Sequence, residues 1–91
     1  MMYSSFLETV FKPTAKAKGL YVLRDDMNFI ARSLLKIPYN EHKDVLRRYI
    51  DEWCKGMAES SIASYAQNLG RRRANLWLLE EVRAKSGSVI E

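Results

Sequence analysis

Three consecutive arginines, Arg71, Arg72 and Arg73, form the longest run of like charge in this 91-residue sequence. A guanidinium group binds carboxylates and phosphates through paired hydrogen bonds, so such a run is typical of a surface that recognises an anion. On a helix the three side chains span about 200° of the circumference, at about 100° per residue, and cannot all point into a core. At least one of them is therefore expected at the surface.

Trp77 follows the arginines within an unbroken apolar run, Leu76 to Leu79, which covers the whole circumference of one helical turn. A chain this short has little structure with which to enclose such a turn, so we expect part of it to face a partner. Arginine and tryptophan are among the residues most enriched at interface hot spots. The pattern predicts a protein-binding surface at Arg71, Arg72, Arg73 and Trp77.

A second basic segment contains Lys12, Lys16, Lys18 and Arg24, with no acidic residue between its ends. If the fold brings this segment beside the arginines, about seven positive charges would form one patch that contacts phosphates. DNA or RNA binding is therefore the alternative function. The stretch "SSIASYAQNLGRRRAN" has polar residues typical of a DNA-reading helix, but no first helix and turn can be placed before it.

Residues for catalysis or metal binding are few. His42 is the single histidine and is expected to be a solvated residue in the first turn of a helix, while Cys54 is the single cysteine and is expected at an inert core position. Asp25 and Asp26 fit the N-terminus of a helix. The four glycines lie far apart and match no phosphate-binding loop. We therefore expect no enzymatic activity, no cofactor and no metal ion.

The elements in the first third of the chain are short. Ser5 and Glu8 match a capping box that begins a helix, and Pro13 is expected to end or redirect that helix before a further helical turn stops at Gly19. Residues 20–23 form a short apolar run that periodicity assigns to neither helix nor strand. With no second strand to pair with, we interpret this run as a buried extended connector.

Two helices are expected in the middle of the chain. Asp25 or Asp26 can cap the first, whose apolar stripe extends through Leu35 and which stops before Pro38. Asn40 can cap the second and clearest helix, in which Leu46, Tyr49, Ile50, Trp53 and Met57 share one face. Its other face offers two ion pairs at i, i+4 spacing, Arg47 with Asp51 and Arg48 with Glu52.

A C-terminal helix is expected after Ser60 or Ser61. Its large apolar residues recur at spacings of three, four and seven, and Arg72 takes the one missing place; they are Ile62, Tyr65, Leu69, Leu76 and Leu79. The helix either runs through Gly70 or breaks there, since glycine costs about 1 kcal/mol in a helix interior. We expect one helix, bent at Gly70 if at all, and a flexible tail at residues 86–91.

Composition places these elements in one soluble domain. Hydrophobic residues make up 47% and charged residues 29%, and fifteen Lys and Arg against eleven Asp and Glu give a net charge of +4. We predict a single all-α domain over residues 1–85, a bundle of four to five helices with its core in 27–35, 46–57 and 62–79. No signal sequence or membrane span is evident, and the lone cysteine fits a reducing cytoplasm.

The stretch "ARSLLKIPYNEHKDVLRRYIDEW", followed by "NLGRRRANLWLLEEV", resembles small accessory proteins of tailed bacteriophages and prophages. The likeness covers about the last two thirds of the chain and depends on Arg72, Arg73, Ala74, Asn75, Trp77 and Leu78. It implies a protein of the bacterial cytoplasm that binds host or phage machinery as an inhibitor or modulator, with recombination, replication, restriction or CRISPR components as partners. Homo-oligomerisation through the same apolar helix is compatible with this function.

Overall fold

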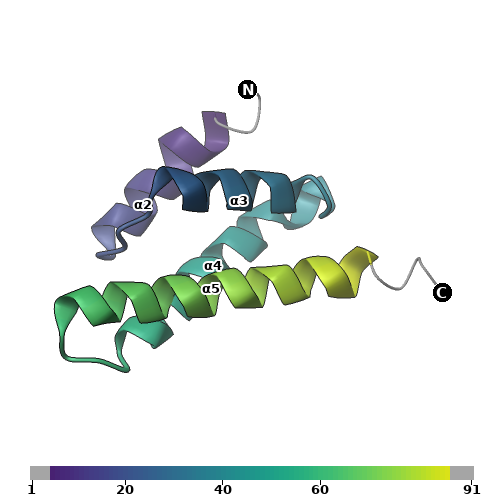
Figure 1. Ribbon diagram of the computed structural model, residues 1–91. Helices are drawn as coiled ribbons and strands as arrows, with labels where there is room; N and C mark the ends of the chain where they lie inside the picture. The colour runs from purple at the N-terminus through teal and green to yellow at the C-terminus, as the bar shows by residue number, and fades with distance from the viewer. Residues whose placement is uncertain (1–4, 87–91) are drawn as a thin grey trace.

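Residues 5–86 are described by a computed structural model, in which every regular element is helical (Figure 1). The predicted all-α class is confirmed. A π-helical turn, η1 (Leu7–Phe11), leads into α2 (Lys12–Ala17), and α3 spans Arg24–Leu34. A 3₁₀ turn, η2 (Tyr39–Glu41), precedes α4 (His42–Met57), and α5 (Ala63–Ser86) is the longest element. The tail predicted for residues 86–91 lies outside the described residues, apart from Ser86 at the end of α5.

The first helical segment does not end at Pro13. A proline lacks an N–H and its ring collides with the carbonyl four residues earlier, so a regular α-helix cannot pass it undisturbed. Here the chain widens into η1, where the backbone N–H of Lys12 donates to the Leu7 carbonyl five residues before it. The Thr14 hydroxyl also donates to the Val10 carbonyl, at 2.7 Å. The helix therefore continues to Ala17, and Gly19 follows it with φ of +88°.

The connector between α2 and α3, residues 20–23, has no regular secondary structure, and only one of its residues is fully buried. Leu20 is buried and Val22 is half-buried, while Tyr21 and Leu23 are exposed. This alternation follows from an extended backbone, in which successive side chains point to opposite sides. Neither Asp25 nor Asp26 is the N-cap of α3, contrary to the prediction, because Leu23 holds that position. Asp26 lies in the first turn and accepts the Leu23 backbone N–H at 3.0 Å.

Helix α4 begins two residues later than Asn40, which lies in η2. His42 is half-buried rather than solvated, and its Nε2 lies 2.8 Å from the Ile37 carbonyl oxygen. The predicted inner face is correct for four residues, since Leu46, Tyr49, Ile50 and Trp53 are all buried, while Met57 and Cys54 are half-buried.

Of the two ion pairs expected along α4, one is present. Arg47 lies 3.7 Å from Asp51, as predicted, whereas the expected pair of Arg48 with Glu52 is not formed. Arg48 lies 3.9 Å from Asp44 instead, and Glu52 binds Lys55 and Arg73. Glu52 is therefore engaged by α5, which intrahelical spacing cannot predict.

Helix α5 runs unbroken through Gly70. This glycine lies where α5 crosses α4. A Cβ atom added to Gly70 would lie 2.6 Å from the Trp53 carbonyl oxygen, and one added to Gly56 would lie 2.6 Å from the Leu69 carbonyl oxygen. Two glycines thus bring the backbones of α4 and α5 into contact. The cost of glycine in the helix interior is offset by this close packing.

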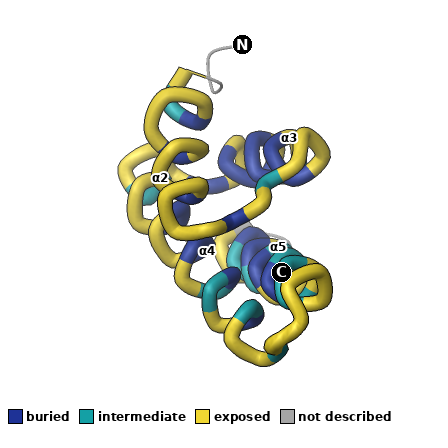
Figure 2. The backbone as a smooth tube through the Cα atoms, turned by 90° about the vertical axis from the view of Figure 1, so that its left-hand side faces the viewer, coloured by how far each residue is buried: buried dark blue, intermediate teal, exposed yellow. Residues whose placement is uncertain are grey.

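The buried side of α5 is not the predicted one. Gly70, Ala74, Leu78 and Val82, spaced four apart, are buried. Figure 2 shows α5 packed beside α4 and α3, with buried positions along it. The expected core residues Ile62, Tyr65, Leu76 and Leu79 are 55%, 62%, 54% and 37% exposed, and Leu35 of the predicted core is 79% exposed. Small residues line the crossing because they allow close approach, so the large apolar residues point outward. The N-terminal segment completes the core with Leu7, Phe11, Ala15 and Leu20.

Candidate protein-binding surface

The outward side of α5 is a stripe of large apolar side chains with one cation at its centre. We call it the outer stripe, and it consists of Ile62, which directly precedes α5, and of Tyr65, Leu69, Arg72, Leu76 and Leu79 on the helix. Leu69 is half-buried and the others are exposed. At about 100° per residue, Arg72 points about 200° from Gly70, which is the inward position at the α4 crossing. The stripe therefore faces away from the rest of the protein.

Arg71 is part of the fold. Its Nε donates to Asp26 at 2.8 Å, and its two terminal nitrogens donate to the Tyr21 carbonyl at 2.7 Å and to Asn68 at 3.1 Å. Its guanidinium carbon also lies 5.1 Å from the ring centre of Trp53. One side chain thus connects α5 to the connector, α3 and α4, and its donors are engaged within the chain.

Asp26, which Arg71 binds, is a buried carboxylate with 4% of its surface exposed. Besides Arg71 and the Leu23 N–H, it accepts a hydrogen bond from Asn75 Nδ2 at 3.2 Å. Asn75 in turn accepts the Tyr49 hydroxyl. Burial, and secondarily the Asp26 charge, raise the pKa of Tyr49, which therefore stays protonated as a donor. These polar groups satisfy one another between α3, α4 and α5.

Arg73 is directed toward α4. Its Nε lies 2.9 Å from Glu52, and one of its terminal nitrogens lies 3.0 Å from Glu59. The hydrogen bond from Arg73 is the largest of the effects that lower the pKa of Glu52 below its ordinary value. The charge of Arg73 is accordingly balanced by Glu52 on α4 and by Glu59 just after α4.

Trp77 is half-buried and packs against the core. The guanidinium carbon of Arg48 lies 5.1 Å from the centre of its ring, which places the indole at the α4 side of α5. Of the four residues predicted to bind a partner, only Arg72 has an exposed side chain that forms no ion pair or hydrogen bond with any residue in 5–86. The sequence prediction missed the apolar members of the outer stripe, although their spacing around Arg72 was the signal that could have found them.

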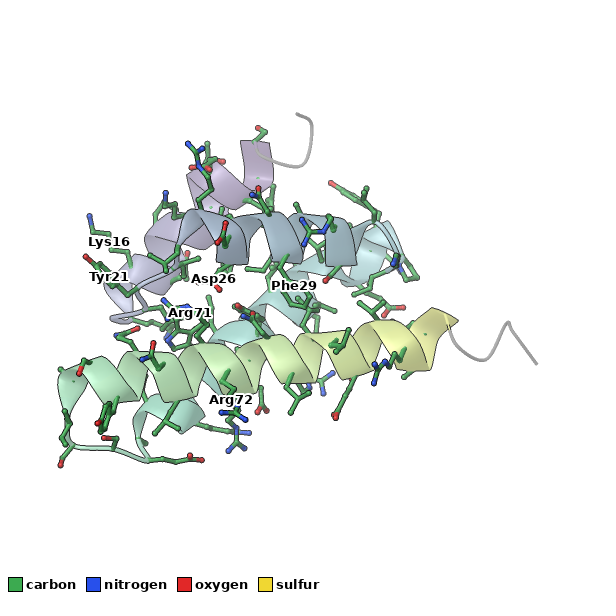
Figure 3. The ribbon with its side chains drawn as sticks, in the orientation of Figure 1. Lys16, Tyr21, Asp26, Phe29, Arg71 and Arg72 are labelled. Carbon is green, nitrogen blue, oxygen red and sulfur yellow. The ribbon has the colours of Figure 1, made fainter. Side chains whose placement is uncertain are left out.

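The basic segment does not merge with the arginines. Lys12, Lys16, Lys18 and Arg24 are exposed, and none forms an ion pair within the described part of the chain. Figure 3 shows Lys16 near Tyr21, above α5, whereas Arg72 projects from the lower side of α5. Arg71 reaches the same connector but is held by Asp26. The patch of about seven positive charges, predicted if the fold joined the two segments, is therefore not formed.

Other sites offer little chemistry. No group of three or more His, Cys, Asp or Glu side chains in residues 5–86 is placed to hold a metal ion. An open depression of 610 Å³ lies between the first helical segment and the end of α3, and it is lined mainly by apolar side chains, among them Phe6, Leu34 and Tyr39. Among the described helices, none combines the length and the apolar content needed to cross a lipid bilayer.

No protein-family model, no curated protein and no solved structure matches this chain. The resemblance to phage accessory proteins therefore stays a prediction, and the outer stripe is the feature of the molecule that indicates a function.

Proposed function

We propose that this protein is a non-enzymatic binding protein that modulates a protein complex, and that the outer stripe is its binding surface. The observation that carries the proposal is the exposure of Ile62, Tyr65, Leu76 and Leu79 around an unpaired Arg72. The complexes we propose are host or phage recombination, replication or defence assemblies in the bacterial cytoplasm, as the sequence resemblance implies.

The energetics favour a protein partner for this surface. Covering a leucine or isoleucine side chain that is wholly exposed to water gains about 1.5 to 3 kcal/mol, so covering several half-exposed ones supplies much of a binding free energy. Contiguous apolar surface of this kind marks interaction sites on soluble proteins, and a central arginine is typical of an interface hot spot. Arg71 and Arg73 flank Arg72 in sequence but support the fold.

A capture experiment with matched variants tests the proposal. The immobilised wild-type protein, Leu76→Glu and Leu35→Glu are each exposed to bacterial lysate in moderate salt. Both substitutions replace an exposed leucine by glutamate, but Leu35, the residue after α3, lines the open depression and is not part of the outer stripe. We expect a protein that binds the wild type and Leu35→Glu and is lost from Leu76→Glu.

Circular dichroism checks that both variants are folded. Capture of the same proteins by Leu76→Glu as by the wild type would contradict the proposal. Binding through apolar contact should also persist as salt rises, unlike binding to phosphates.

A second candidate function is contact with a nucleic acid through the basic segment that runs from Lys12 to Arg24. The observation that favours it is the exposure of Lys12, Lys16, Lys18 and Arg24 without ion pairs among the described residues. The ion pairs among residues 5–86 lie mostly on α4 and α5, so the positive charge near α2 is not balanced by neighbouring acids.

Retention on immobilised duplex DNA tests this candidate. If these lysines contact phosphate, retention falls with salt at a log-log slope of about 0.9 per phosphate neutralised, and Lys12→Gln with Lys16→Gln lowers that slope by about two. Absence of retention at low salt removes the candidate. Equal retention of the double variant would show that another part of the surface contacts the DNA.

A further inference from the structure

We infer that the outer stripe receives one α-helix of a different protein, and that this helix carries a carboxylate opposite Arg72 within its apolar face. The inference rests on the proposed function and names the chemistry of the partner. Its starting point is the register of the stripe. Ile62, Leu69 and Leu76 recur every seven residues, as do Tyr65, Arg72 and Leu79, with alternating steps of three and four.

This register is the one by which two helices pack along their length, with each side chain entering a gap on the facing helix. From Ile62 to Leu79 the stripe spans about 25 Å at about 1.5 Å per residue, which is the length of five helical turns. Helix α5 is unbroken from Ala63 to Leu79 and Ile62 directly precedes it, so the stripe can lie along a second helix.

Arg72 sets the charge of the partner. When a helix covers the stripe, the guanidinium loses its contact with water, and a desolvated cation needs an anion beside it. No residue of the stripe is acidic, and the nearby carboxylates of Glu52 and Glu59 already bind Arg73. A carboxylate on the partner can accept two parallel hydrogen bonds from the guanidinium. The acid must therefore come from the partner.

A second copy of this chain meets these requirements poorly. In a parallel pair of α5 helices the two Arg72 side chains lie at the same level. In an antiparallel pair with Ile62 opposite Leu79, the two arginines lie in the same central layer of side chains. Shifting the antiparallel pairing by seven residues brings Arg72 toward Glu80 of the other copy. It then places Tyr65 opposite Arg83 and Ile62 opposite the end of α5. Arg72 accordingly also keeps copies of the chain apart, as a polar residue in an apolar seam does.

Two synthetic 21-residue amphipathic peptides test the charge requirement. Both carry leucine at the positions that face the stripe, and they differ only at the central position, which is glutamate in one and lysine in the other. Fluorescence anisotropy measures their affinity for the wild type and for Arg72→Glu. We expect the wild type to bind the glutamate peptide at least tenfold more tightly than the lysine peptide, and Arg72→Glu to reverse the preference.

Equal affinities, or a preference that Arg72→Glu leaves unchanged, would overturn the inference. The proposed function can fail separately. If lysate capture depends on Leu76 while the peptides show no charge preference, the function stands and the inference fails. If the peptides behave as expected while lysate capture is indifferent to Leu76→Glu, the chemistry of the surface stands and the function fails.

Sedimentation tests the second role of Arg72. We expect a monomeric wild type, and self-association of Arg72→Leu, in which the apolar stripe is complete. A wild-type dimer that Leu76→Glu dissociates would make a second copy the occupant and overturn the inference. A folded Arg72→Leu that stays monomeric at the same concentration would contradict the role of Arg72 in keeping copies apart.

Discussion

Three adjacent arginines have three different environments because successive side chains leave a helix about 100° apart. Arg71 points toward α3 and binds the buried Asp26, and Arg73 points toward Glu52 and Glu59. Arg72 points away from both. Residue type alone therefore does not identify the binding residue, whereas the direction of each side chain does.

Replacing Arg71 should be costly, because it leaves the Asp26 carboxylate buried without its cation. We predict that Arg71→Ala lowers the free energy of unfolding by about 3 kcal/mol in urea denaturation. The matched change Arg72→Ala, one residue along, should stay within about 0.5 kcal/mol of the wild type. Equal effects of the two alanine variants would show that the Asp26 pair does not hold the fold together.

The pair of Glu52 with Arg73 should make stability depend on pH. Arg73 lowers the pKa of Glu52 in the folded state below its ordinary value of 4.5, so the folded state favours the charged carboxylate. The resulting stabilisation is complete above that ordinary value and is lost as pH falls through the lowered pKa. We predict that Arg73→Gln flattens the loss of unfolding free energy between about pH 6 and about pH 3. Identical pH profiles for the wild type and the variant would exclude this coupling.

At the scale of elements, the crossing of α4 and α5 decides which side of α5 is buried. Sequence patterns identify a helix face by its large apolar residues, and on α4 this works because Leu46, Tyr49, Ile50 and Trp53 do face the core. On α5 the inward positions are Gly70, Ala74, Leu78 and Val82, of which the first two have almost no apolar side chain to reveal them. The error arose because close packing favours small residues.

Substitution at the crossing should reverse the usual effect of replacing glycine in a helix. Gly70→Ala would gain up to about 1 kcal/mol from helix propensity alone. Here the added methyl meets the Trp53 backbone, so we predict a net loss of about 1 to 3 kcal/mol in unfolding free energy. Ser64→Ala, at an exposed position of the same helix, serves as control and should gain a few tenths of a kcal/mol. A stabilised Gly70→Ala protein would mean that the backbones are further apart.

For the molecule as a whole, the all-α class, the extent of α3 and α4 and the continuity of α5 could be predicted from periodicity, capping residues and prolines. The passage of the first helical segment through Pro13 could not, because it depends on the wide turn of η1. The partners of Arg71 and Arg73 could not be predicted either. They lie 45 and 21 residues away in the chain, at Asp26 and Glu52, and only the packing of three helices brings them together.

The most direct measurement of the central claim, that the outer stripe binds another protein, is site-specific photocrosslinking in bacterial cells. A photoreactive phenylalanine analogue replaces Leu76 in the stripe or, as control, Arg32, which is exposed on α3. We predict a covalent adduct with a different protein from position 76, lost when Arg72→Glu is added, and no such adduct from position 32. An adduct from position 32 alone, or none from position 76 in a folded protein, would contradict the claim.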